Sequence, residues 1–210
     1  MRRVNVVLTD LLSCSSFVYH NVRVVGLNSN EQQDIQAEWL DRVLAGNTAP
    51  WVVCAFHHPI YSTGKDRDNA ELRSLWKPVF DRYKVDLVLQ GHDHTYGRTG
   101  FDVPPAGAVP PTVANVASGV QKKDEKTGTI YVVSVSGPKM YDNQRQPFMK
   151  RLAEDTQLYQ IIHVDGGMLR FEARTAVGDL YDAFELHKQE GDINRLVEIE
   201  PEVPENKRGE

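Results

Sequence analysis

The chain has 210 residues, of which 40% are hydrophobic, so it is long enough to form one globular domain with its own core. Its formal net charge is −5 at pH 7 and no basic stripe runs along it, which argues against a nucleic-acid-binding surface. No apolar stretch approaches the roughly 20 residues that a membrane-spanning helix needs. The two cysteines, Cys14 and Cys54, are too few for a disulfide scaffold.

Residues 1–14 are predicted to be an irregular lead-in to the first strand. Met1-Arg2-Arg3 and the apolar residues after it resemble the start of a signal peptide. Asn5 and Asp10 interrupt the apolar stretch, which is unfavourable for the hydrophobic part of such a signal. We therefore favour a lead-in over an export signal.

The next elements alternate between short apolar runs, which predict strands, and apolar residues at three- and four-residue spacing, which predict helices. Short apolar runs at 21–27, 51–56 and 85–89 predict buried strands. Between them, three- and four-residue spacings predict helices from the capping-box pattern Ser29-x-x-Gln32 to about Ala45, stopped by Gly46, and over 70–83. This order predicts an α/β layered sheet.

The second half of the chain is predicted to contain a long loop, several strands and a charged tail, with no further helix. Four prolines mark a long irregular loop over 96–128, after which 129–134 is a predicted strand. Residues 158–164 and 168–173 form a predicted hairpin around the 165–167 turn, and 181–186 a last strand. The charged tail, 188–210, is expected to be poorly ordered or peripheral.

Two histidine clusters follow two of the predicted strands. Phe56-His57-His58-Pro59 comes directly after one strand and Gly91-His92-Asp93-His94 after the next. In open α/β sheets ligands bind beyond the carboxyl ends of the strands, and imidazole is the commonest metal-binding side chain. Alternate residues of an extended chain share a face, and Gly91 permits a sharp turn. We therefore predict that His57, His92 and His94 reach one cavity as metal ligands, with Asp93 facing outward.

His58 is open to several roles in this pattern. It can contact substrate, transfer a proton or simply pack, so we treat it as a candidate catalytic residue. The remaining histidines, at 20, 163 and 187, have no supporting context. Tyr61, Lys65, Arg67 and Arg98 are able to face a phosphate, but each is more simply a loop residue.

The two clusters resemble motifs of a known enzyme family. Residues 51–62 resemble the strand and histidine motif of the calcineurin-like metallophosphoesterases, and residues 91–98 resemble their Gly-His-x-His motif. Tyr96, two residues beyond the second histidine of that motif, favours the purple acid phosphatase branch. Residues 36–40 and 178–186 add weaker similarity, so that the resemblance covers about residues 15–187, taken as the metallophosphoesterase domain.

The resemblance carries several implications. It implies an α/β fold: part of a four-layer αββα sandwich with mixed sheets and flanking helices. It implies metal-dependent hydrolysis of phosphate mono- or diesters by a binuclear centre of iron, zinc or manganese, with a phosphate ester as partner. In that scheme His57 and His92 hold one metal and His94 the other, and an extracytoplasmic location is allowed.

The chain also departs from the family pattern. The family has earlier motifs: an Asp near its start, a Gly-Asp that supplies a bridging carboxylate, and a Gly-Asn-His. None precedes the strand at 21–27, and the dipeptides Gly178-Asp179 and Gly191-Asp192 lie too late in the chain to replace them. We therefore expect a C-terminal portion of such an enzyme that binds at most one metal weakly, has little activity alone, and exposes sheet edges whose partner strands are missing.

Two alternatives to the enzyme stay open. The chain can be a non-catalytic remnant that serves as an interaction module on the same scaffold, or a module that binds a single metal ion.

Overall fold

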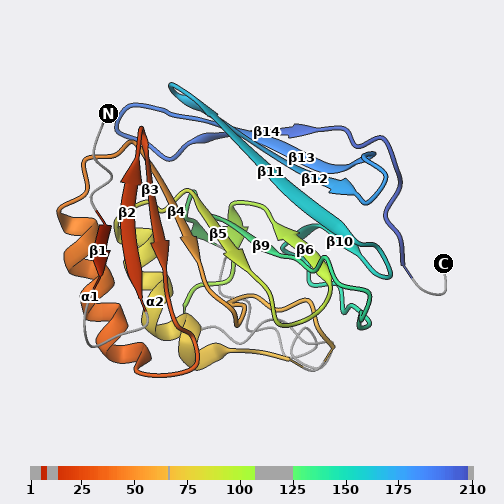
Figure 1. Ribbon diagram of the computed structural model, residues 1–210, viewed down its shortest axis with the longest axis horizontal. Helices are drawn as coiled ribbons and strands as arrows, with labels where there is room; N and C mark the ends of the chain where they lie inside the picture. The colour runs from red at the N-terminus through yellow and green to blue at the C-terminus, as the bar shows by residue number, and fades with distance from the viewer. Residues whose placement is uncertain (1–5, 9–13, 66, 107–124, 208–210) are drawn as a thin grey trace.

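The computed structural model describes residues 6–8, 14–65, 67–106 and 125–207. In it, two helices, an eight-stranded sheet and a four-stranded sheet form three successive layers (Figure 1). The helices are α1 (Gln33–Ala45) and α2 (Ala70–Arg82). None of the helices in the described part of the chain is long and apolar enough to cross a membrane.

The larger sheet contains a parallel centre with antiparallel strands on both sides. β3, β4, β5 and β9 run parallel to one another, β1 and β2 extend the sheet beyond β3, and β6 and β10 extend it beyond β9. In spatial order the strands are β1 (Val6–Leu8), β2 (Ser15–Tyr19), β3 (Val22–Gly26), β4 (Trp51–Ala55), β5 (Leu87–Gln90), β9 (Ile130–Val133), β6 (Tyr96–Thr99) and β10 (Met149–Ala153).

The smaller sheet is an antiparallel meander formed by the C-terminal part of the chain. Its strands are β11 (Leu158–Asp165), β12 (Met168–Thr175), β13 (Leu180–His187) and β14 (Arg195–Ile199). A separate two-stranded ribbon joins β7 (Asp102–Val103) to β8 (Glu125–Lys126).

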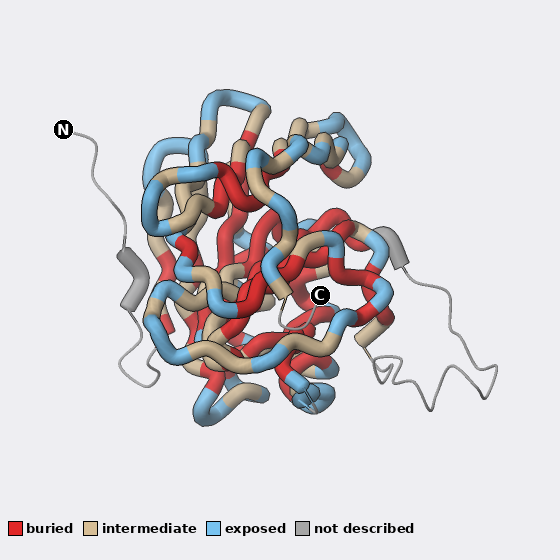
Figure 2. Tube along the Cα trace, turned by 90° about the vertical axis from the view of Figure 1, so that its right-hand side faces the viewer, coloured by how far each residue is buried: buried red, intermediate tan, exposed pale blue. Residues whose placement is uncertain are grey.

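Two hydrophobic cores hold the layers together. The sequence of β4 is apolar throughout because this strand contributes side chains to both cores. Val52 and Cys54 belong to the core against the helices, whereas Trp51 and Val53 belong to the core between the sheets. Successive side chains of a strand point to opposite faces, so a strand buried on both faces has no polar alternation. Figure 2 shows that the buried parts of the chain lie in the interior and the exposed parts mostly around it.

The predicted helices and central strands are present, but the first helix does not begin as expected. Gln32, the residue before α1, is in the left-handed conformation with φ 50°, and it makes no side-chain cap hydrogen bond. The expected capping box does not form because the Ser29 hydroxyl is bonded to His58 instead. At the other end, Gly46 does follow the last helical residue.

Two expectations about the ends of the domain need correction. β3 is not an exposed edge, because β2 pairs with it along its whole length and β1 pairs with β2. Part of the tail expected to be poorly ordered forms β14, which pairs with β13, and the backbone N–H of Glu154 donates to the carbonyl of Asn206. Most of the 1–14 lead-in and of the 96–128 loop lies outside the described residues.

The layering agrees with part of the expected αββα sandwich. The fold is a mixed α/β arrangement in which helices cover one face of the larger sheet and the smaller sheet covers the other. Among the described residues no helix covers the outer face of the smaller sheet. The structure therefore contains three of the four expected layers.

Candidate metal centre

The two histidine clusters leave the sheet side by side. β4 and β5 are neighbouring parallel strands, so their carboxyl ends meet at one edge. The backbone N–H of Phe56 donates to Leu89, and the N–H of Gly91 donates to His57 at 3.0 Å. These bonds continue the strand pairing into the loops and fix the two clusters next to each other.

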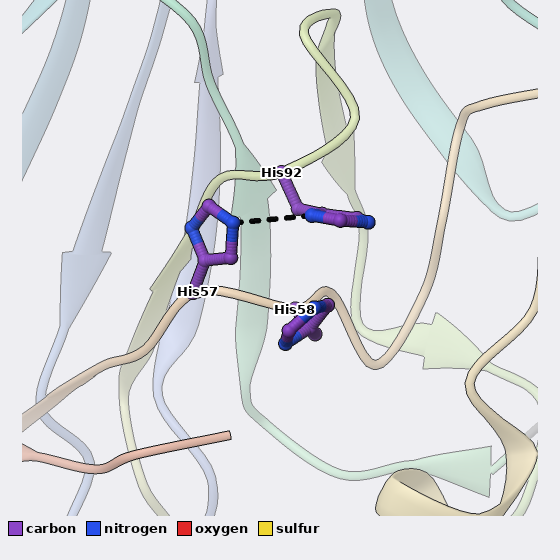
Figure 3. A group of neighbouring side chains, drawn as sticks. All are labelled: His57, His58 and His92. Atoms are coloured by element: carbon purple, nitrogen blue, oxygen red, sulfur yellow. Dashed lines mark hydrogen bonds between the residues drawn. The ribbon is translucent and has the colours of Figure 1, made fainter. Parts of the chain in front are cut away.

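Three imidazole rings converge at this edge. One ring nitrogen from each of His57, His58 and His92 lies within 4.8 Å of the others (Figure 3). The Nε2 atom of His57 is 3.1 Å from the Nδ1 atom of His92, and the ring centroids of His58 and His92 are 4.3 Å apart. The arrangement is a candidate metal site whose members come from two strand ends.

His58 is oriented by a residue from another loop. The hydroxyl oxygen of Ser29, which is buried, accepts the backbone N–H of His58 at 2.9 Å and lies 2.9 Å from the His58 Nδ1 atom. A partner on Nδ1 orients the ring and leaves Nε2 available to a ligand. Sequence reasoning missed Ser29 because its spacing to Gln32 indicated a helix cap.

The surroundings lower the pKa of two of the rings. Burial, followed by the neighbouring His57, lowers the pKa of His58 below its ordinary value. Burial, followed by His58, likewise lowers the pKa of His92. Since a metal ion binds unprotonated imidazole, both shifts favour metal binding near neutral pH.

His94 does not share a face with His92, so that geometric expectation is wrong. His92 and His94 have positive φ angles of 67° and 49°, and the backbone between them is therefore not extended. The Nδ1 atom of His94 lies 2.8 Å from the carbonyl oxygen of Lys139, and its ring stacks on Tyr141 with centroids 5.1 Å apart. His94 is outside the three-histidine group, and its role as a ligand of a second metal stays a prediction.

Asp93 is buried, which corrects the expectation that it faces outward. Its carboxylate accepts a hydrogen bond from the Ser62 hydroxyl and another from Arg67 Nη1 at 3.1 Å. The left-handed residues on either side turn this side chain under the loop. Asp93 thereby fastens the segment that follows His57 and His58 to the segment that carries His92.

The cationic and phenolic candidates for phosphate contact have other partners. Arg98 is buried and bonded to Asp182 and Glu198 of the smaller sheet. The Tyr61 hydroxyl is buried and donates to the carbonyl of Pro104, while Arg67 pairs with Asp93. Lys65 is exposed on the loop. Arg98 thus lies in β6 and not in a loop as expected, and both Arg98 and Tyr61 make buried structural contacts.

A cavity of about 480 Å³ adjoins the three-histidine group on the His58 side. Ser29, Asn30, Gln33, His58 and residues 68–72 line it. No local sequence pattern predicts this cavity, because it lies between the loop before α1 and the start of α2. His58 is the residue that the cavity shares with the histidine group.

Comparison with known proteins points in the same direction as the histidine motifs. Residues 5–96 match the family model of the calcineurin-like phosphoesterases, a segment that contains β4, β5 and all three converging histidines. The chain resembles calcineurin-like phosphoesterases. The sequence expectation of this resemblance is thus confirmed.

Curated relatives narrow the resemblance to purple acid phosphatases. An uncharacterised protein of Mycobacterium tuberculosis is 36% identical over 104 aligned residues, covering 40% of this chain and 20% of the relative. An Fe(3+)-Zn(2+) purple acid phosphatase of Arabidopsis thaliana is 35% identical over 69 residues, covering 30% of this chain and 15% of that enzyme. The matches thus span a fifth or less of the length of these two relatives.

Solved structures support the fold of this phosphoesterase-like chain. A purple acid phosphatase from yellow lupin seeds matches with a TM-score of 0.59 at 19% identity, over 85% of this chain and 33% of the lupin chain. The structure of PhoD matches with a TM-score of 0.56 at 12% identity, over 94% of this chain and 46% of that chain. At these identities the likeness concerns the arrangement of the layers.

The donor set in the phosphoesterase-like region fits one metal ion. Imidazole is a ligand that zinc, iron and manganese accept, and three protein ligands leave a position open. Within the described residues the group of converging ligands includes no carboxylate. A second cation close to the first therefore has no anionic ligand in this group to offset the mutual repulsion.

Proposed function

We propose that the chain carries part of the catalytic site of a metal-dependent phosphoesterase that hydrolyses phosphate mono- or diesters. The observation that supports this most directly is the convergence of His57, His58 and His92 at the carboxyl ends of parallel strands, within a segment that matches the phosphoesterase family. The proposal concerns the reaction class and names no physiological substrate.

In this proposal the three imidazoles hold one metal ion of the iron, zinc or manganese kind. When bound, such an ion activates water and withdraws charge from a phosphoryl oxygen. The residues of this chain prepare the site: Ser29 orients the His58 ring, and the Gly91 N–H fixes the backbone of His57. Asp93 holds the loop that begins at Ser62 against the loop that carries His92.

A binuclear centre needs more ligands than this group provides. His94, from the Gly-His-x-His motif, is the residue we propose for a second ion, in line with the resemblance. Anionic ligands from outside the three-histidine group would be needed to hold two cations together. We therefore expect the chain alone to bind at most one ion weakly and to be weakly active or inactive by itself.

The reaction class is tested with the protein loaded in turn with Zn²⁺, Mn²⁺ or iron. Hydrolysis of p-nitrophenyl phosphate and of its bis-ester is measured for the chain and for a longer form that includes the missing family motifs. We expect hydrolysis that requires metal, is stronger in the longer form, and is lost in His92→Ala but kept in the surface control His163→Ala. Failure of the metal-loaded longer form to hydrolyse either ester would refute the proposal.

The absence of a carboxylate from the described histidine group favours one alternative, a non-catalytic module on the same scaffold. This alternative predicts a sharp thermal transition that a chelator does not move, with no metal found by elemental analysis. The enzyme proposal predicts the opposite: a melting temperature that rises with added metal and falls when the metal is removed.

A further inference from the structure

The cavity beside His58 has an unusual balance of hydrogen-bonding groups. Three side-chain amides line it: Asn30, Gln33 and Asn69. Each amide also makes a hydrogen bond within the protein, and the partner in each case is an oxygen. If the NH₂ end of an amide makes that bond, its oxygen remains free to accept a hydrogen bond from a ligand. If the oxygen makes the bond, the NH₂ end remains free to donate.

The NH₂ groups are the ends that are occupied. Gln33 Nε2 donates to the Ser29 carbonyl at 2.8 Å, and Asn69 Nδ2 donates to the Pro59 carbonyl at 2.7 Å. Because a carbonyl oxygen only accepts, flipping either amide would place two acceptors against each other. The orientation of both amides is therefore fixed by their partners.

The same argument applies to Asn30. Its Nδ2 lies 3.0 Å from Asn28 Oδ1, which also accepts the backbone N–H of Asn30 at 3.0 Å. The Asn28 atom is therefore an acceptor, and the Asn30 nitrogen must face it. The amide oxygens of Asn30, Gln33 and Asn69 have no hydrogen-bond donor among the residues that the structure describes.

The carboxylates that line the cavity, like the amide oxygens, are hydrogen-bond acceptors. Neither Lys nor Arg lines it, and the two carboxylates that do are those of Asp68 and Glu71. Asp68 is paired with Arg73, whereas Glu71, which is exposed, forms no ion pair within the described residues. The side chains of Asn30, Gln33, Asn69 and Glu71 thus offer acceptor oxygens at the cavity, and Glu71 adds one negative charge without an ion-pair partner in the described part of the chain.

We propose that this cavity binds the alcohol part of the phosphate ester, and that it selects alcohols rich in hydrogen-bond donors, bearing hydroxyl or ammonium groups. The inference rests on the proposed function, because a phosphate at the histidine group places the rest of an ester beside His58. A volume of about 480 Å³ accommodates such a group. An apolar alcohol would leave the three amide oxygens without donors, and an anionic one would meet Glu71.

Binding is measured by NMR titration of the full chain, with and without one equivalent of Zn²⁺, following the side-chain amide signals of Asn30, Gln33 and Asn69. The probes are glycerol 1-phosphate and phosphoethanolamine, with n-propyl phosphate as the apolar control of similar size and 3-phosphoglycerate as the anionic one. We expect saturable shifts at these amides with the first two probes, at least about tenfold tighter than with the controls.

Variants of Glu71 test the charge without endangering the fold, because this side chain is exposed. Glu71→Gln should weaken phosphoethanolamine binding about two- to fivefold, and Glu71→Lys should weaken it further, while n-propyl phosphate is unaffected. Glu38→Gln, which changes an exposed carboxylate of α1 that does not line the cavity, should have no effect.

Following ³¹P signals in the same samples separates this inference from the proposed function. Selective binding without hydrolysis would uphold the cavity assignment and agree with a chain that is inactive by itself, and the proposed function would then be decided by the longer form. Equal affinity for propyl and glycerol phosphates, or shifts absent from the three amides, would overturn the cavity assignment even if both esters were hydrolysed. A preference unchanged in both Glu71 variants would remove the ammonium part of the proposal.

Discussion

Arg98 of β6 and Asp182 of β13 form a two-bond ion pair across the interface between the two sheets. Arg98 Nε and Nη2 donate to the Asp182 carboxylate at 2.6 and 2.9 Å, and both side chains are almost completely buried. The Tyr96 hydroxyl donates to the same carboxylate at 2.7 Å, and Glu198 of β14 accepts further bonds from Arg98. The strand that follows the Gly-His-x-His motif is thus anchored to the C-terminal sheet.

Replacing Arg98 with Met should destabilise the protein strongly. Removing one partner of a buried ion pair leaves the other charge uncompensated, and the expected loss is about 3–5 kcal/mol of unfolding free energy. Urea denaturation followed by circular dichroism measures it. Arg82→Ala, which removes an exposed pair with Asp41, should change the stability by less than about 1 kcal/mol. Equal losses in the two variants would show that the Arg98 network is not what joins the sheets.

The part of the fold predictable from sequence is the part with local hydrophobic periodicity. The strands around Trp51–Ala55 and Leu87–Gln90 are apolar on both faces, so their runs are continuous, and α2 has a three- and four-residue spacing. β14 was missed because it is an edge strand with Arg195 and Glu198 in it, and edge strands are often charged. Its pairing depends on β13, which no local pattern reveals.

The candidate site shows the same limit at the level of single residues. The clusters identified His57 and His92 as neighbours because strand ends of a parallel sheet meet. The positions of Asp93 and His94 depend on left-handed backbone at His92 and His94, which their residue types do not indicate. The role of Ser29 depends on a contact with His58, 29 residues further along the chain. Such contacts follow from the tertiary structure.

Zinc uptake should depend on the three converging histidines. His57→Ala, His58→Ala and His92→Ala each remove one of the three ring nitrogens, so each should lower the affinity of the chain for Zn²⁺ at least about tenfold. Isothermal titration calorimetry, with elemental analysis of the dialysed protein, measures stoichiometry and affinity. His94→Ala should leave the binding of the first ion unchanged, because His94 is outside the group. A larger loss in His94→Ala than in His58→Ala would contradict this assignment.

Ser29→Ala should weaken metal binding without removing a ligand. The hydroxyl fixes both the backbone and the ring of His58, and loss of a residue that orients a ligand typically costs about 10- to 100-fold in affinity. The measurement is the same Zn²⁺ titration. Ser74→Ala provides the control, because Ser74 is exposed and its hydroxyl donates to a carbonyl of its own helix. Ser29→Thr, which keeps the hydroxyl, should restore part of the affinity, and no difference between the Thr and Ala variants would refute this role.

Cys54 should be unreactive in the native protein across the alkaline range. Its burial, followed by the nearby Asp86, raises the pKa of the Cys54 thiol far above its usual range, so that it stays protonated. Alkylation requires the thiolate, and the rate for an ordinary thiol rises about tenfold per pH unit up to a pKa of about 8.5. Mass spectrometry after iodoacetamide treatment at pH 7 and pH 9 should show no modification of Cys54 at either pH, and rapid modification in denaturant. Modification at pH 9 in the folded protein would show that the helix-side core opens locally.

Gly97 in β6 should not tolerate a side chain. A Cβ atom at this position would overlap Thr63 Cγ2 and lie 3.2 Å from Thr63 Cβ, and Thr63 is itself buried and hydrogen-bonded to Thr95. Thr63 cannot give way without disturbing the loop that Asp93 fastens, so Gly97→Ala should cost about 1–3 kcal/mol of stability. Gly137→Ala is the matched control, because a Cβ atom there meets no atom within 4 Å and the stability should change by less than about 0.5 kcal/mol. Urea denaturation of both variants decides the matter: if Gly97→Ala is as stable as Gly137→Ala, β6 does not pack against Thr63 as the structure shows. If Gly97→Ala regains stability when combined with Thr63→Ser, which lacks the clashing methyl group, the contact with Thr63 is the cause.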